Sequence, residues 1–141
     1  MKERFTRKLV LAALDLDKKM RMEVNVSDYA TGGVLSIECE DKLWRPVAFL
    51  SKSLNETERN YEIHDKEMLV IIRGLENWRH LLEGAHFKFE IWTDHKNLEY
   101  FMKVQKLNQR QARWVLYLSR FDFTLKYVPR TKIGKTDRLN R

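Results

Sequence analysis

Hydrophobic and polar residues alternate strictly over residues 19–27, near the start of the chain. The apolar positions of this stretch are Met20, Met22, Val24 and Val26. A period of two residues that ends in β-branched side chains predicts a strand with one buried face. Two further apolar runs follow, "GGVLSIEC" and "WRPVAFLS", separated by the charged turn "EDKL". The three runs predict an antiparallel meander, with Pro46 at a strand start or on an edge strand because proline cannot donate to a ladder.

Helical periodicity replaces the alternation in "HDKEMLVIIRGLENWRHLLEG". Its apolar residues recur at steps of three and four, which predicts one continuous helix that Gly84 ends. The stretch "FKFEIWTD" then predicts a fourth strand, and "HKNLEYFMK" predicts a short helix. A further helix is expected in "NQRQARWVLYLSRF", where the residues on one stripe are Ala112, Val115, Leu116 and Ser119.

The last predicted elements are a fifth strand in "FDFTLKYVP", which Pro129 ends, and a short terminal segment in "KTDRLNR". The expected order along the chain is therefore βββ-α-β-α-α-β-(α). A meander followed by alternating strands and helices predicts an α/β fold, in which helices pack on a five-stranded mixed sheet.

Length and composition favour a single globular domain. The chain has 141 residues, of which 43% are hydrophobic, and its four Trp and seven Phe suffice for a core. The single cysteine, Cys39, excludes an internal disulfide and a cysteine-based zinc site and suits a reducing compartment. No apolar run approaches the ~20 residues that span a bilayer, and the basic N-terminus lacks the apolar stretch of a signal peptide. We therefore expect an intracellular protein that has no membrane partner and is not secreted.

Positive charge is concentrated in the last part of the chain. The net charge is +7, and residues 103–141 hold eleven Lys and Arg against two acids, whereas residues 1–102 have a slight excess of acids. A polyanion would be attracted to the C-terminal part, because neutralising phosphates releases condensed counterions. Charge alone leaves two interpretations open, a nucleic-acid-binding face and a solvated basic surface with no such role.

Five stretches of the chain point to one family. They are "SDYATGGVLS", "RPVAFLSKSLNETERNYEIHDKEMLVII", "WTDHKNLEYF", "ARWVLYLSRFDFTLKYVP" and "TDRLNR". In these stretches the sequence resembles the RNase H domain of reverse transcriptases from gypsy-type LTR retrotransposons. The resemblance implies an RNase H-like fold for residues 20–141, and residues 1–19 resemble the tail of the connection to the polymerase domain. The resemblance implies a location in the cytoplasm, in a virus-like particle or in the nucleus. No Tyr-x-Asp-Asp polymerase motif is present in the chain, so we expect no template copying by it.

The resemblance implies a site of four acids that holds two divalent ions, Mg²⁺ or Mn²⁺, about 4 Å apart. Three acids match the positions of the family: Glu67 in "DKEML", Asp94 in "WTDH" and Asp137 in "TDRLNR". At the remaining position, on the first strand, Asn25 replaces the aspartate. An amide keeps one oxygen ligand but cannot bridge two cations. We therefore expect weakened metal binding and a cleavage rate lower by about 10³-fold or more.

These positions also have ordinary structural interpretations. Without the resemblance, Glu67 would be an acid that stabilises a helix N-terminus, Asp94 would be a helix N-cap, and Asp137 would be a solvated charge. Asp28 is a poor substitute for the missing acid, because its odd offset from Asn25 sends its side chain to the opposite face of the strand.

The resemblance and the basic C-terminal part also predict contacts to an RNA–DNA hybrid, whose backbone is recognised through phosphates and 2′-hydroxyls. The residues expected to make them are Ser27, His64, His95, Lys96, Asn97, Arg110 and Arg113. Two functions remain open. The first is a metal-dependent ribonuclease that acts on RNA–DNA hybrids beside a polymerase domain. The second is a catalytically inactive relative that binds nucleic acid or protein. Asn25 favours the second function, because it predicts little catalytic turnover. The otherwise intact motifs favour descent from the first, an active ribonuclease.

Overall fold

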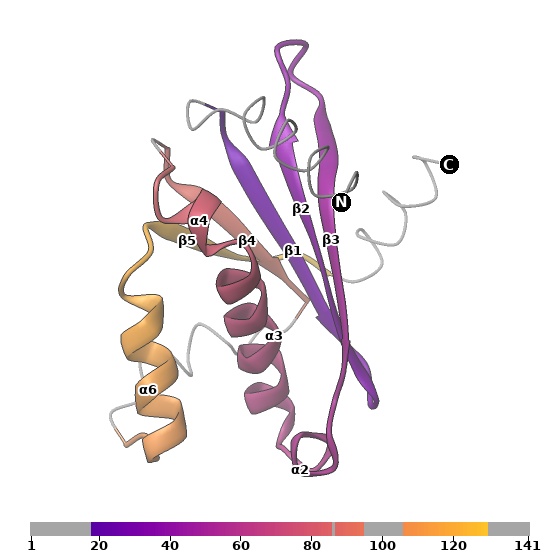
Figure 1. The fold of residues 1–141 in the computed structure, drawn as a ribbon, viewed down its shortest axis with the longest axis vertical. Coiled ribbons are helices and arrows are strands. Elements are labelled where there is room, and N and C mark those ends of the chain that lie inside the picture. Colours follow the sequence, from indigo (N-terminus) through magenta and orange to yellow (C-terminus); the bar gives the residue numbers. More distant parts are fainter. Residues whose placement is uncertain (1–17, 86, 95–105, 130–141) are drawn as a thin grey trace, which may run out of the picture.

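A five-stranded mixed sheet forms the centre of the fold (Figure 1). The computed structural model describes residues 18–85, 87–94 and 106–129. Its strands are β1 (Met20–Val26), β2 (Ala30–Glu38), β3 (Trp44–Ser53), β4 (Phe89–Thr93) and β5 (Phe123–Tyr127), in the order β3-β2-β1-β4-β5. β2 is antiparallel to β1 and β3, whereas β4 is parallel to β1 and β5. The predicted sheet is therefore confirmed, and Pro46 lies on an edge strand as expected.

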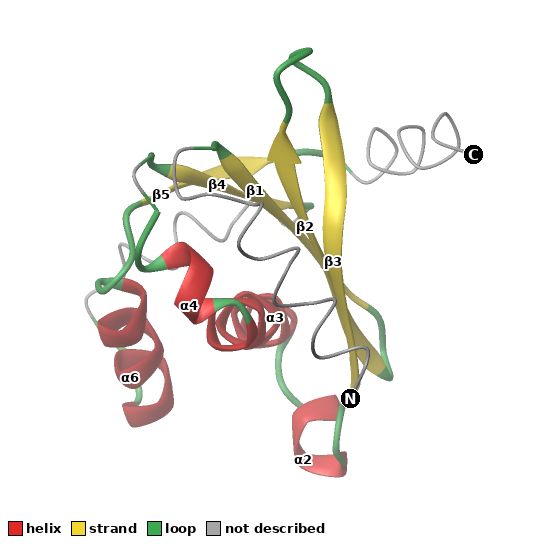
Figure 2. Ribbon diagram, turned by 45° about the horizontal axis from the view of Figure 1, so that its top comes forward, coloured by secondary structure: helices red, strands yellow, loops and turns green. Residues whose placement is uncertain are grey.

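The helices are α2 (Glu56–Arg59), α3 (Ile63–Asn77), α4 (Arg79–Leu82) and α6 (Gln109–Leu118). Among them, α3, α4 and α6 lie on one face of the sheet (Figure 2). α2 is a single turn that the sequence analysis did not expect, and Asn55 and Glu58 form a capping box at its start. No helix in the described ranges is long and apolar enough to cross a membrane. The helices predicted in residues 95–103 and 135–141, and nearly all of the lead-in over residues 1–19, lie outside the described residues.

The prediction of one continuous helix in "HDKEMLVIIRGLENWRHLLEG" is wrong. Trp78 leaves the helical conformation, with φ −112° and ψ 21°, between the end of α3 and the start of α4. Its indole is buried and reaches β2, where a Cβ added to Gly33 would lie 3.4 Å from Trp78 Cη2. The helix thus breaks at a bulky ring that lies against the sheet. Helical periodicity cannot predict this break, because it does not depend on contacts with other elements.

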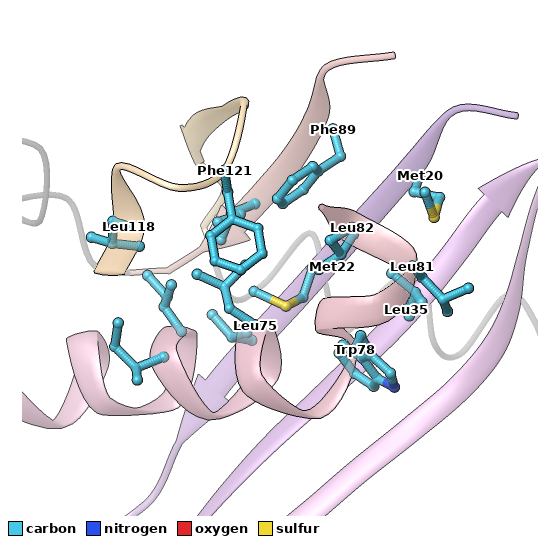
Figure 3. Packing of buried hydrophobic residues seen from close by; sticks show 14 of the residues in the cluster. Met20, Met22, Leu35, Leu75, Trp78, Leu81, Leu82, Phe89, Leu118 and Phe121 are labelled. Carbon is cyan, nitrogen blue, oxygen red and sulfur yellow. The ribbon is translucent and has the colours of Figure 1, made fainter. Parts of the chain in front are cut away.

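The alternation of β1 predicts its buried face correctly. The side chains on that face, each no more than 9% exposed, are Met20, Met22, Val24 and Val26. Met22 packs directly on α3, because a Cβ on Gly74 would lie only 2.5 Å from Met22 Sδ. The missing side chain of this glycine lets the helix approach the strand closely. Figure 3 shows Met22 among Leu75, Leu82 and Phe121 in the centre of the core.

The predicted stripe of α6 does not face the core. Leu116 is 72% exposed, and Ala112 and Ser119 are exposed as well. The helix instead turns Trp114 and Leu118 toward the core. These two side chains bury more apolar area than an alanine and a serine would, which favours the observed orientation.

Candidate functional site

The carboxyl ends of β1 and β4 bring two of the predicted site positions together. The two strands are parallel, and Glu23 of β1 lies beside Trp92 of β4. Asn25 and Asp94 each lie two residues farther along the chain, so both are at the carboxyl ends of these neighbouring parallel strands. Asn25 is exposed, because it lies on the polar side of β1, turned away from the face that packs on α3.

Glu67 reaches the same strand end from the beginning of α3. Its side chain is buried, at 4% exposure, and the Thr93 hydroxyl donates to Glu67 Oε2 at 3.4 Å. Thr93 is the last residue of β4 and directly precedes Asp94. The structure therefore gathers Asn25, Glu67 and Asp94 at one end of the sheet. Asp137, the fourth predicted position, lies outside the described residues.

The Asn25 side chain leans toward β2. Asn25 pairs with Gly32 in the antiparallel ladder, and a Cβ built on Gly32 would lie 2.8 Å from Asn25 Oδ1. The amide oxygen thus occupies space that the side chain of any other residue at position 32 would fill. Since β2 and β4 flank β1 on opposite sides, the amide leans away from the strand that leads to Asp94.

Two predicted substrate contacts lie near this end of the sheet. His64, in the first turn of α3, is partly exposed, and its Nε2 lies 3.7 Å from Glu62 Oε2. Ser27 is the first residue of the turn between β1 and β2. Its Oγ accepts a hydrogen bond from the N–H of Ala30 at 3.1 Å. Asp28 lies in that turn, beyond the end of β1. The contacts predicted for His95, Lys96 and Asn97 lie outside the described residues.

A buried acid that the sequence analysis missed joins α3 to α6. Asp65 is 5% exposed and accepts hydrogen bonds from Arg110 Nη2 at 2.6 Å and from Gln111 Nε2 at 3.0 Å. The Arg110 guanidinium also lies 4.1 Å from the centre of the Tyr61 ring and 5.5 Å from that of Trp114. This cluster fixes the start of α6 against the start of α3, close to Glu67 in the chain.

The Asp65–Arg110 pair changes the interpretation of one predicted hybrid contact. The structure shows a structural role for Arg110, because its guanidinium pairs with Asp65 inside the protein. A contact of Arg110 with nucleic acid stays a prediction. Arg113, one turn later on α6, is exposed. No local pattern could have revealed the pair, because 45 residues separate its members.

The sheet face opposite the helices carries a charged and aromatic cluster. The Arg21 guanidinium lies between two indoles, 4.6 Å from the ring centre of Trp44 and 4.0 Å from that of Trp92. Trp92 Nε1 donates to Glu90 at 2.8 Å, and Lys126 Nζ lies 3.0 Å from the same carboxylate. Burial acts to raise the pKa of Glu90, but these two partners hold it below its usual value. The contacts tie β3, β1, β4 and β5 together across this face.

The donor atoms at the strand ends fit a hard divalent cation in kind. The carboxylates of Glu67 and Asp94 and the amide of Asn25 all offer oxygen, the ligand that Mg²⁺ and Mn²⁺ prefer. In the described ranges, no group of three or more His, Cys, Asp and Glu side chains could hold a metal ion. The Asn25 amide is neutral, whereas a carboxylate at this position would carry a negative charge.

Solved structures share this fold. The foamy viral protease-reverse transcriptase in complex with dsDNA superimposes with a TM-score of 0.65 and 18% identity, over 81% of this chain and 24% of the viral chain. LC11-RNase H1, isolated from compost, superimposes with a TM-score of 0.58 and 14% identity, over 86% of this chain and 91% of the enzyme. The predicted RNase H-like fold is therefore confirmed.

Sequence comparison identifies relatives as well. The Tf2-3 and Tf2-4 transposon polyproteins of Schizosaccharomyces pombe (strain 972) are each 40% identical to the chain over 134 residues. That alignment covers 94% of this chain and 10% of either polyprotein, so the chain spans about a tenth of the curated relatives it matches. The family described as the RNase H-like domain found in reverse transcriptase matches residues 15–121. The chain therefore belongs to the family of RNase H-like domains of reverse transcriptases.

Proposed function

We propose that residues 20–141 are the RNase H domain of a gypsy-type LTR retrotransposon reverse transcriptase, with an impaired ability to cut the RNA of RNA–DNA hybrids. The observation that supports this most is the placement of Asn25, Glu67 and Asp94 at the same end of the sheet, where β1 and β4 run parallel. A foamy viral protease-reverse transcriptase with the same fold has been solved in complex with an RNA/DNA hybrid. The polymerase domain of the same polyprotein is the natural partner in such an arrangement.

In this proposal Glu67, Asp94 and Asp137 hold Mg²⁺ or Mn²⁺, and Asn25 contributes one neutral oxygen. Such ions supply activation of water and stabilisation of the leaving 3′-oxygen when they are bound. The chain itself positions the ligands, since Glu67 is buried and Thr93 donates to its carboxylate. Cleavage of a labelled hybrid with Mn²⁺ or Mg²⁺, slow in the parent and absent in a Glu67→Ala variant, tests this function.

The second candidate is a module that binds nucleic acid without cutting it. Asn25 favours it, because a neutral amide would bind divalent cations more weakly than the carboxylate that the family has at this position. Both candidates bind an RNA–DNA hybrid, but only the first cuts its RNA.

Binding of a hybrid is expected to weaken steeply with salt, because phosphate contacts release counterions. Arg113→Glu, which reverses an exposed charge on α6 near the start of α3, should weaken binding several-fold and reduce the salt slope by about 1. Arg79→Glu is the matched control, since Arg79 is also exposed but follows the opposite end of α3. Fluorescence anisotropy of a labelled hybrid measures both effects. Salt-independent or undetectable binding would contradict a nucleic-acid surface and favour a protein-binding module.

A further inference from the structure

We infer that Gly32 is a positioning residue for the side chain at position 25. The two residues face each other across β1 and β2, and a Cβ on Gly32 would lie 2.8 Å from Asn25 Oδ1. Cβ atoms in proteins essentially never come this close to another heavy atom. The absence of a side chain on β2 is thus what allows side chain 25 to lean over that strand. The consequence for metal binding rests on the proposed function, whereas the geometry does not.

The conflict created by a methyl group at position 32 would fall on side chain 25 alone. The nearest atom outside Asn25 is the Leu50 carbonyl oxygen of β3, at 3.7 Å, which is ordinary van der Waals contact. The backbone around Gly32 therefore has room for a Cβ, and only Asn25 must move. To restore an ordinary contact, the Asn25 oxygen must move by more than about half an ångström, away from the new Cβ.

This displacement is large compared with the tolerance of a metal site. Distances between a metal and its ligands vary by only about 0.2 Å in well-formed sites. On the other side of β1 lies β4, whose end leads to Asp94. A carboxylate at position 25 that is pushed off Gly32 would leave the place that Asn25 Oδ1 takes in the structure. Gly32 therefore determines where a ligand at position 25 stands.

The geometric part is tested with Gly32→Ala and Gly33→Ala. Gly33 is the matched control, because it is the next residue of the same strand and its Cβ would point to Trp78 on the opposite face, at 3.4 Å. In ¹H–¹⁵N spectra, Gly32→Ala should shift the Asn25 side-chain amide resonance, which is assigned by its loss in Asn25→Ala. Gly33→Ala should leave that resonance in place. An unmoved Asn25 amide in Gly32→Ala would overturn the inference.

A double-mutant cycle covers the case in which Gly32→Ala folds poorly. Gly32→Ala should change the urea midpoint of unfolding less favourably in the parent than in the Asn25→Ala background, where it should be neutral or stabilising. Removal of side chain 25 removes the atom that the new methyl group would meet. An equal loss in both backgrounds, or failure of both to fold, would refute a specific role for Gly32 in placing side chain 25.

Calorimetry with Mn²⁺ then separates this inference from the proposed function. Asn25→Asp should bind Mn²⁺ more tightly than the parent, and Asn25→Asp/Gly32→Ala should lose tenfold or more of that affinity, the usual range for residues that orient a ligand. Asn25→Asp/Gly33→Ala should retain it. Suppose that Gly32→Ala shifts the Asn25 amide resonance and that the double-mutant cycle is non-additive, but that Asn25→Asp does not bind Mn²⁺ more tightly. This result would support the contact between Gly32 and side chain 25 and contradict the proposed metal site. A gain that Gly32→Ala does not reduce would contradict the positioning role.

Discussion

Replacing Asn25 with aspartate is expected to raise cleavage of a labelled RNA–DNA hybrid by about 10³-fold or more in the presence of Mg²⁺ or Mn²⁺. The substitution turns an exposed amide near the end of β1, the strand that runs parallel to β4, into a carboxylate of the same shape. In the proposed site, the new carboxylate would supply the negative charge that the neutral amide lacks. Initial rates of parent and variant, measured at equal metal concentration, give the comparison.

The melting temperature of the same variant is an independent measurement. Without metal, a further anion near Glu67 and Asp94 should lower it through like-charge repulsion. With Mg²⁺ or Mn²⁺ it should rise, because a ligand that binds only the folded state stabilises that state. Asn25→Ala is the control, and we expect it to show neither the metal-dependent rise nor the gain in cleavage.

Two further variants show whether the gained activity comes from this site. Glu67→Ala and Asp94→Ala, each combined with Asn25→Asp, should abolish it. Rapid cleavage by the unchanged chain would contradict the expectation, because another ligand would then have taken the place of the missing carboxylate. If Asn25→Asp binds Mg²⁺ but remains inactive, the defect lies elsewhere, and Asp137 is the next position to test.

Arg110→Ala is expected to lower the free energy of unfolding by about 3 kcal/mol, the lower end of the range for breaking a buried ion pair. The variant leaves the Asp65 carboxylate, 5% exposed, without the guanidinium that lies 2.6 Å from it. It also removes the cation from the Tyr61 ring. We take the lower end because the Arg110 side chain is 34% exposed and water can partly replace it. Urea unfolding followed by circular dichroism measures the change.

Arg113→Ala is the matched control for Arg110→Ala. It removes the same side chain from an exposed position of the same helix, so its effect should stay within about 0.5 kcal/mol. Asp65→Asn should recover part of the loss when it is combined with Arg110→Ala, because it removes the unpaired buried charge. Equal stabilities of Arg110→Ala and Arg113→Ala would show that the pair between α3 and α6 contributes nothing measurable.

Several features of the fold could be predicted from short stretches of sequence. The alternation from Met20 to Val26 determined which side of β1 is buried, since successive side chains of a strand point to opposite faces. The same alternation put Asn25 on the exposed side. The short loops between the first three apolar runs predicted an antiparallel meander, which the structure confirms. Each of these predictions depends only on residues that are close together in the chain.

Other features depend on contacts between distant parts of the chain. The break at Trp78 accompanies the contact of its indole with Gly33 on β2, and the orientation of α6 depends on what Trp114 and Leu118 meet in the core. A periodic pattern shows that a helix has an apolar side, but the partner surface decides which side chains are buried and where the helix stops. For this reason two predictions that used periodicity alone were wrong.

The sequence by itself determined the sheet, its buried face and the residue types at the family's site positions, because these follow from local periodicity and from the order of motifs. Only the tertiary structure decided which of them meet. It joined Glu67 to the end of β4 through Thr93, paired Asp65 with Arg110 across 45 residues, and left the space over Gly32 that Asn25 fills. The physical reason is that such contacts are set by the register of strands and the approach of helices, and these are properties of the whole packed chain.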